Sequence, residues 1–446
     1  MVRAVGVGVV TFVVGCSKPA PIPAPPDGGV PQSSADAEIN ARAASEAVEY
    51  VDPGYGPEVH SLHVARSIVL RQQPNLRSAP IGTIAQDMRV LWSRAAKGPG
   101  CPRLWVQIEP RGWVCSIHLE PSKRPPRAVE LPRLPEGAVV PGLYGKVIGG
   151  RTRAFKTLRD ARRKKGGRAL ADATLVRFNR EISLGRQRFW RTTQGELVDA
   201  RKVIPKDPSR MGGIELGTGR SPLLPLGWVR VGGPATVWEE PARWIELGEL
   251  PPRTIVPVLR RSKDGASVRI GPGMWVDANA IRVARLVPPP PGVGPDEKWI
   301  DVDLAEQVLV AYEGTRPVFA TLVSTGEKNP TPTGMWRIWI KFAETEMDGQ
   351  VKGRTYQVAD VPWTMFFHRS YALHGVYWHD RFGEPTSSGC VNLAPADARF
   401  LYHWTDPPIP DGWTMSYPTS ETPGTLIRIR NGIEPAPPKT GKVAAR

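Results

Sequence analysis

Apolar and polar residues alternate in short runs along much of this chain. Clear examples are the segments 299–304, 307–312 and 318–323. A period of two residues is typical of strands with one buried face. Glycine (45 residues) and proline (48 residues) together exceed a fifth of the 446 positions, which suits short strands joined by many turns. The pattern predicts a mainly β protein with few helices, one of them over residues 394–404.

Three segments repeat a small pattern: a strand, a turn that contains glycine, an apolar pair that ends in valine, and another short apolar strand. They cover residues 104–117, 189–203 and 268–281. A repeated β unit is the simplest account of this recurrence. We therefore expect modules over residues 61–125, 138–210 and 226–288. The alternative is that these segments are only β-rich spacers.

The N-terminus has the features of an export signal. Arg3 precedes the apolar run 4–14, which is too short to span a bilayer, and Gly15-Cys16 follows it. The tetrapeptide that ends at Cys16 resembles the lipobox of bacterial lipoproteins. This resemblance implies a signal peptide over residues 1–16 and a diacylglyceryl group on Cys16. The protein is then expected to be exported to the cell envelope, lipid-anchored and facing the periplasm, unless the signal is an ordinary one with an incidental cysteine.

The remaining cysteines are interpreted for an oxidising compartment. Cys101 and Cys115 lie fourteen positions apart in one expected module, so a disulfide between them is predicted, with two buried thiols as the alternative. Cys390 is then the odd cysteine, which makes it a candidate reactive thiol.

Charge divides the chain in two. The whole chain carries +16, yet residues 296–433 carry −5 and the preceding part carries +19. The proline-rich stretch 288–292 lies just before the change of sign, and we place a domain boundary there. A C-terminal domain is expected over residues 296–432. Disordered segments are expected before the first module, over residues 17–60, and as a basic tail over residues 433–446.

The basic run Arg159–Arg168 is the strongest local concentration of charge. Such a run could bind nucleic acid, but an exported protein seldom meets it. We expect no nucleic-acid partner and interpret the run as a solvated insertion loop, with contact to anionic wall polymer or lipid as the alternative.

Three polar motifs follow one another in the C-terminal domain. Residues 324–334 contain Ser-Thr-Gly and Thr-Pro-Thr-Gly, residues 371–375 are Tyr-Ala-Leu-His-Gly, and residues 387–392 are Ser-Ser-Gly-Cys-Val-Asn. Acyl transfer by a thiol needs a thiolate, a base that takes its proton, and donors for the oxyanion. Cys390 can supply the thiol and His374 the base. The backbone N–H groups of Gly389 and Cys390 can form the oxyanion hole.

These motifs resemble the L,D-transpeptidase catalytic domain of the YkuD type, over roughly residues 298–430. The resemblance implies that Cys390 forms an acyl-enzyme with a peptidoglycan tetrapeptide stem and passes the acyl group to an amine. That amine can belong to a second stem peptide or to an envelope protein. His374 is implied as the base, with the carbonyl of Gly375 fixing its tautomer. The chemistry requires no metal and no cofactor.

Several neighbouring residues have supporting roles in this resemblance. Ser388 stands where many members of the family have histidine. Ser388, Asn392 and Tyr371 are expected to orient the loop or to bind substrate. His379 also precedes Cys390, but it lies in a turn-like stretch, whereas His374 ends an apolar run and would be held more firmly.

The repeated segments resemble bacterial SH3-like wall-associated modules, the first over residues 64–120 and the third over 228–287, with the second weaker. The expected fold class is therefore mainly β: SH3-like β-barrel modules followed by a β-rich catalytic sandwich with few helices. Two other functions compete. One is a peptidoglycan-binding envelope lipoprotein without activity. The other is a zinc peptidase built around His374 and His379, which lacks the usual i, i+4 ligand spacing with a supporting glutamate.

Overall fold

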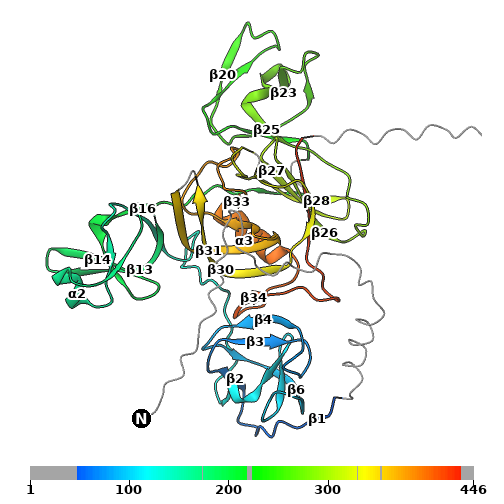
Figure 1. Ribbon diagram of the computed structural model, residues 1–446. Helices are drawn as coiled ribbons and strands as arrows, with labels where there is room; N and C mark the ends of the chain where they lie inside the picture. Colours follow the sequence, from blue (N-terminus) through cyan, green and yellow to red (C-terminus); the bar gives the residue numbers. More distant parts are fainter. Residues whose placement is uncertain (1–47, 173, 218–222, 329, 352–353, 433–446) are drawn as a thin grey trace, which may run out of the picture. The chain divides into compact units, whose positions relative to one another are not determined.

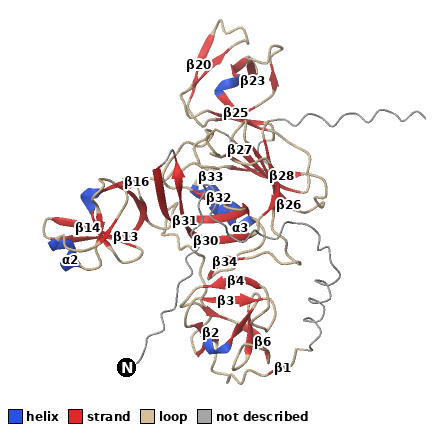
Figure 2. Cartoon of the chain, viewed as in Figure 1, coloured by secondary structure: helices blue, strands red, loops and turns tan. Residues whose placement is uncertain are grey.

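The computed structural model describes residues 48–432, apart from 173, 218–222, 329 and 352–353. Strands dominate the described residues, which contain two α-helices, α2 (Leu158–Arg163) and α3 (Pro395–Trp404) (Figure 2). The prediction of a mainly β protein with few helices is confirmed. Within the described part of the chain, no helix is long and apolar enough to cross a membrane.

The chain forms two compact units, and the C-terminal domain contributes to both. The first unit contains residues up to 211 together with 337–380 and 392–424. The second contains residues 212–336, 381–391 and those from 425 onward. Each unit is described separately below.

The first unit opens with a module of short antiparallel strands (Figure 1). Its strands are β2 (Ser61–Val64), β3 (Ile68–Arg71), β4 (Pro80–Ile84), β5 (Arg89–Val90), β6 (Trp92–Ala96), β7 (Trp105–Ile108), β8 (Trp113–Cys115) and β9 (Leu119–Ser122). Alternate apolar side chains of these strands form one buried cluster that includes Leu62, Leu70 and Val114. A disulfide joins Cys101 to Cys115, as the sequence predicts.

Part of the segment expected to be a disordered tether is a strand. Strand β1 (Tyr50–Val51) pairs with β6, with Tyr50 opposite Ala96. Tyr50 also stacks on Trp113, at 6.3 Å between ring centroids. These aromatic and ladder contacts extend the first module beyond its expected start at residue 61.

A second module of the first unit contains both short and long strands. They are β10 (Leu143–Val147), β11 (Arg153–Ala154), β12 (Arg168–Ala169), β13 (Leu175–Leu184), β14 (Gln187–Thr192), β15 (Leu197–Asp199) and β16 (Val203–Lys206). The basic run expected to be a loop is partly the helix α2. Thr157 caps this helix by accepting a hydrogen bond from the N–H of Asp160, and Lys164 ends it with a left-handed backbone. This Thr-x-x-Asp spacing is a local helix signal that the charge pattern obscures.

The remainder of the first unit is a long hairpin with one helix against it. Its elements are β30 (Ile340–Val351), β31 (Arg354–His368), β32 (Tyr371–Gly375), β33 (Val391–Leu393), α3 and β34 (Trp413–Ser416). Strand β31 pairs with β30 and β32, and β32 pairs with β33. Helix α3 packs against β31 and β32. Pro395 occupies its first turn, where a missing N–H costs nothing, and its buried face includes Ala398 and Leu401.

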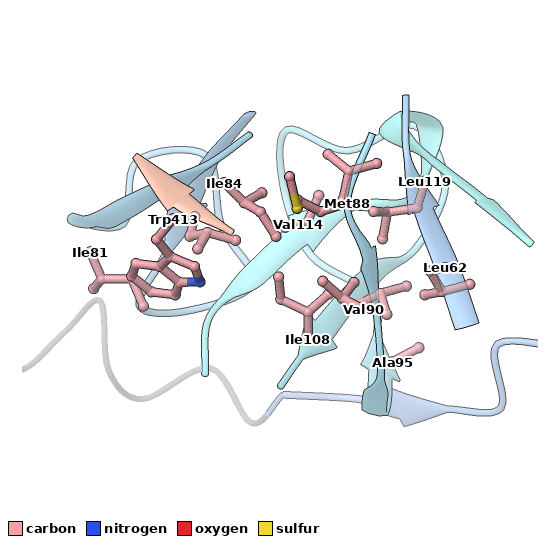
Figure 3. Packing of buried hydrophobic residues seen from close by; sticks show 13 residues of the cluster. Leu62, Ile81, Ile84, Met88, Val90, Ala95, Ile108, Val114, Leu119 and Trp413 are labelled. Atoms are coloured by element: carbon pink, nitrogen blue, oxygen red, sulfur yellow. The ribbon is translucent and has the colours of Figure 1, made fainter. Parts of the chain in front are cut away.

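The first module receives a strand from this distant segment. Strand β34 pairs with both β30 and β4. It places the indole of Trp413 inside the buried cluster of the first module, close to Ile81 and Ile84 (Figure 3). Trp413 is 1% exposed.

The second unit contains the third module. Its strands are β18 (Leu226–Val229), β19 (Ala235–Trp238), β20 (Glu246–Leu250), β21 (Ile255–Pro257), β22 (Arg260–Arg261), β23 (Ser267–Gly271), β24 (Met274–Asp277) and β25 (Ile281–Ala284). All three modules end alike, with a strand, one 3₁₀ turn and a further strand. The turns cover Ser116–His118, Ala200–Lys202 and Ala278–Ala280.

The second unit also holds a six-stranded sheet of the C-terminal domain. In spatial order its strands are β17 (Ile214–Glu215), β28 (Arg316–Leu322), β27 (Val308–Glu313), β26 (Lys298–Asp303), β35 (Leu426–Arg430) and β29 (Gly334–Arg337). A buried ion network joins β26 to the parallel strand β35. Asp301 accepts from Arg428 Nε at 2.7 Å and pairs with Arg430 at 2.9 Å. The last strand of the domain is thereby fixed beside its first.

Candidate functional site

His374 is a buried residue of strand β32, with 2% of its surface exposed. Its Nδ1 lies 3.3 Å from the carbonyl oxygen of Gly375. A carbonyl only accepts, so the ring proton resides on Nδ1 and Nε2 carries the lone pair. Burial lowers the pKa of His374 to about 4; the Gly375 carbonyl raises it and nearby His379 lowers it. The ring is therefore a neutral imidazole at neutral pH, able to accept a proton at Nε2.

Aromatic and polar contacts fix the residues around His374. The ring of Trp378 stacks on it at 5.8 Å between centroids. The N–H of Val376 donates to the carbonyl of Leu393 at 3.0 Å. Asn392 is 3% exposed and its Nδ2 donates to Nε2 of His379 at 2.9 Å. Asn392 thus orients the chain after β32, and His379 uses Nε2 as an acceptor there.

The motif that contains Cys390 is held by one side chain of the Thr-Pro-Thr-Gly motif, both in the second unit. Thr331 Oγ1 accepts from the N–H of Gly326 at 2.8 Å and donates to the carbonyl of Gly389 at 2.7 Å. Gly326 and Ser387 also form an isolated parallel bridge. The first and third sequence motifs are therefore hydrogen-bonded together.

The turn at Cys390 has its own internal hydrogen bonds. Ser387 Oγ donates to the carbonyl of Cys390 at 2.6 Å and accepts from the N–H of Gly389 at 3.0 Å. Gly389 has φ of 139°, in the region that favours glycine. The N–H of Gly389 therefore donates to Ser387 in this structure, and it can stabilise a substrate oxygen only after leaving Ser387. The oxyanion role of Gly389 stays a prediction. The short Ser side chain competes for this donor, as serine commonly does in turns.

Cys390 is buried, with 1% of its surface exposed. It directly precedes strand β33, the partner of the strand that carries His374. Cys16, the expected lipidation site, lies outside the described residues.

Gln307 is a buried residue of the site that the sequence motifs do not include. Its Nε2 donates to Thr325 Oγ1 at 2.7 Å and its Oε1 accepts from the Thr325 N–H at 2.8 Å. It is 3% exposed and has a left-handed backbone with φ of 54°. Its position in a turn between two strands was the available signal, but a glutamine in such a turn is usually exposed to solvent.

Two of the expected orienting residues, Tyr371 and Ser388, are half-buried. Tyr371 begins strand β32 and stacks on His368, with 6.0 Å between ring centroids. Ser388 is half-buried between Ser387 and Gly389. Across the described ranges, no three His, Cys, Asp or Glu side chains are grouped so as to hold a metal ion.

Residues 297–429 match the family model of the YkuD L,D-transpeptidase catalytic domain. The chain therefore carries an L,D-transpeptidase catalytic domain. The matched range contains His374, Cys390 and Asn392 together with the Thr-Pro-Thr-Gly motif. No curated protein has a significant match to the chain.

Solved L,D-transpeptidases are similar to this catalytic domain. The enzyme of Stackebrandtia nassauensis is 25% identical, covers 31% of this chain and 58% of its own, and has a TM-score of 0.21. The catalytic domain of the E. faecium enzyme is 21% identical over 30% of this chain and 98% of its own, with a TM-score of 0.24. The Mycobacterium smegmatis enzyme is 17% identical over 35% of this chain and 72% of its own, with a TM-score of 0.24. The chain thus spans less than two thirds of the first of these proteins.

Proposed function

We propose that the protein is a peptidoglycan L,D-transpeptidase in which Cys390 is the nucleophile and His374 the base. The observation that carries the proposal is the state of His374 inside the matched domain. Its Nδ1 faces the Gly375 carbonyl, and burial keeps the ring neutral. A ring held in this tautomer presents Nε2 as the proton acceptor that a thiol nucleophile requires of its base.

The proposed reaction has two acyl-transfer steps. In the first, Cys390 Sγ attacks the carbonyl carbon of the third residue of a tetrapeptide stem, and the thiol proton moves to Nε2 of His374. The C–N bond to the terminal D-amino acid then breaks, and the departing amine takes that proton, which leaves a thioester. In the second, an acceptor amine attacks the thioester and gives its proton to His374. Cys390 leaves as the thiolate and regains the proton.

The test is acylation of Cys390 by purified tetrapeptide stems, followed by intact mass on protein treated with a reductant. We expect one adduct in the wild-type protein and none in Cys390→Ala. His374→Ala should abolish acylation, whereas His379→Ala should mainly weaken substrate binding through its contact with Asn392. Acylation that persists in His374→Ala but is lost in His379→Ala would reverse the choice of base.

The products identify the acceptor. A cross-linked stem dimer indicates a stem amine, a peptide attached to lysine indicates an envelope protein, and a trimmed tripeptide indicates water. If no variant and no wild-type protein forms an adduct under reducing conditions, the catalytic proposal is wrong and a wall-binding function takes its place.

The envelope location belongs to the same proposal. Lipidation at Cys16 would anchor the chain, and the three modules, if SH3-like, would contact the wall. Membrane partition of wild-type and Cys16→Ala proteins at high salt tests the anchor, because high salt screens the attraction of basic residues to anionic lipid. Complete membrane retention of the variant would argue against it.

A further inference from the structure

Two arginines of the third module donate hydrogen bonds to the segment that leads to Cys390. We call residues 383–390 the nucleophile loop. Within it, Glu384 Oε1 accepts from Nε and Nη2 of Arg230 at 3.0 and 2.6 Å, and from Nη2 of Arg282 at 3.3 Å. Arg282 Nε also donates to the carbonyl of Gly383 at 2.8 Å. Charged donors thus hold both the side chain and the backbone at the start of the loop.

Both arginines are themselves fixed. Arg282 belongs to strand β25, has 15% of its side chain exposed and donates through Nη1 to the carbonyl of Ala305 at 3.2 Å. Arg230 follows strand β18 and donates to the carbonyl of Asn279 at 3.2 Å. Glu384 has 21% of its side chain exposed. Charge-assisted hydrogen bonds in such a partly buried setting are stronger and more directional than exposed ones.

The opposite side of the loop is held by the end of strand β28. The N–H of Gly383 donates to the carbonyl of Val323 at 2.8 Å, and Ser324 Oγ donates to the carbonyl of Glu384 at 2.5 Å. The N–H of Ser387 donates to the carbonyl of Thr325 at 2.9 Å. The loop is therefore clamped between the catalytic sheet and the third module, six residues before Cys390.

We propose that Arg282 and Arg230 are positioning residues for Cys390, which makes the third module part of the catalytic apparatus rather than a spacer. The proposal rests on the proposed function. Neither arginine would touch the reacting atoms; each acts through Glu384 and Gly383. Since a displacement of about 1 Å at a nucleophile can cost about 100-fold in rate, loosening this clamp should slow acylation strongly.

Arg282→Ala in the full-length, reduced protein tests the clamp through single-turnover acylation of Cys390. We expect the maximal acylation rate to fall by at least about tenfold, with the half-saturating stem concentration nearly unchanged. Glu384→Gln should retain most of the rate, because its amide oxygen still accepts from both arginines. If the contact only stabilised the fold, Arg282→Ala would lower the amount of folded protein and leave the acylation rate per folded molecule unchanged.

Arg285→Ala is the matched control. Arg285 also belongs to the third module and pairs with Glu306 at 2.6 Å, in a contact of similar burial that does not touch the nucleophile loop. We expect its acylation rate to stay within about twofold of wild type. Equal acylation rates for the Arg282 and Arg285 variants would overturn the role of the clamp. Acylation of the wild-type protein in the same experiment would still support the proposed function. Failure of the wild-type protein to acylate would instead overturn the function itself.

An independent observation concerns a cavity of about 480 Å³ in the first module. Arg89, Arg124, Arg127 and Arg133 line it, with His63, Asp87 and Glu120 at the same cavity. The two carboxylates are hydrogen-bonded to His63, at 3.3 and 3.0 Å. Within the described residues, Arg124, Arg127 and Arg133 form no ion pair with a carboxylate. The four guanidinium groups outnumber the two carboxylates at this cavity, so the hollow as a whole attracts an anion.

We infer that this cavity binds a phosphate or carboxylate anion. The wall is built rather than accidental, because Arg89 and Arg127 form a backbone bridge and Arg89 Nε donates to the carbonyl of Pro125 at 2.8 Å. Planar guanidinium groups match the oxygens of both anions with paired hydrogen bonds.

Calorimetric titration with pyrophosphate and with citrate tests this site. We expect the triple variant Arg124→Gln, Arg127→Gln, Arg133→Gln to bind at least about tenfold more weakly. The control Arg159→Gln, Arg162→Gln, Arg163→Gln removes the same charge from exposed positions of helix α2 and should bind as wild type does. Binding of one probe alone assigns its class, and binding of both assigns a general anion site. Absence of binding by wild type, or an equal loss in the control, would overturn the inference.

Discussion

Replacing Trp413 with alanine should destabilise the first module although Trp413 lies about 290 residues after that module ends. The indole is 1% exposed and belongs to the module's buried cluster (Figure 3). A Trp side chain that buries roughly 200 Å², at about 25 cal/mol per Å², represents about 5 kcal/mol before allowance for burial in the unfolded chain. We therefore expect a loss of about 3 to 5 kcal/mol, the range measured for Trp→Ala changes in cores.

Hydrogen exchange read by mass spectrometry is the suitable assay, because a chain of several modules does not unfold in one step. The opening free energy of the peptide that contains strand β4 should fall, since β34 pairs with β4. Gly82→Ala should act in the same direction, because a Cβ at Gly82 would overlap the indole ring. Trp244→Ala, at a position 81% exposed, is the matched control and should change stability by less than about 0.5 kcal/mol. A loss below about 1 kcal/mol for Trp413→Ala would refute the packing argument.

Three further predictions concern other buried features. Asp301→Asn should cost about 3 to 5 kcal/mol in denaturant unfolding of the second unit, because it leaves Arg428 buried without its carboxylate and removes one of the two carboxylates that pair with Arg430; Asp296→Asn, at an exposed position, is the control. Replacing Cys101 and Cys115 together by serine should cost about 3 kcal/mol, from the loop that their disulfide closes, and unchanged unfolding would contradict it. Because the folded pKa of His374 is about 4 against 6.5 when unfolded, wild type should lose up to about 3 kcal/mol more stability than His374→Gln as pH falls from 6.5 to 4, and parallel pH profiles would contradict this.

Local patterns were sufficient for the elements whose signals lie within a few residues. The helix expected over 394–404 is present as Pro395–Trp404, because Pro at the first turn and an apolar face against the hairpin both lie in its own sequence. The catalytic domain was recognisable because its motifs retain their order and spacing. The prediction of a loop over the basic run was wrong where helix α2 forms, because the helix signal lies in the cap at Thr157 and not in the basic residues.

Contacts between distant segments left no such signal. Strand β34 has four residues, and nothing in its sequence indicates that it pairs with β4, about 330 positions earlier. Likewise, Arg282 and Glu384 are 102 positions apart and each resembles an ordinary surface charge. The oxyanion role assigned to Gly389 also depended on a detail that sequence cannot give, namely that the neighbouring Ser387 hydroxyl already accepts its N–H.

Each of the three modules contributes a buried contact to the C-terminal domain, and this argues against studying the domain by truncation. The first surrounds Trp413, the second stacks Tyr144 on Tyr377 at 3.6 Å between centroids, and the third pairs with Glu384. Tyr377 lies three residues after His374, and Glu384 six before Cys390. Removing the modules would expose the indole of Trp413 to water and leave the Glu384 carboxylate without its arginines. Both changes cost free energy, and the loops that carry these residues would rearrange to reduce that cost. Low activity of a truncated domain would therefore reflect the loss of these positioning contacts. The kinetics of this site should be measured on the full chain.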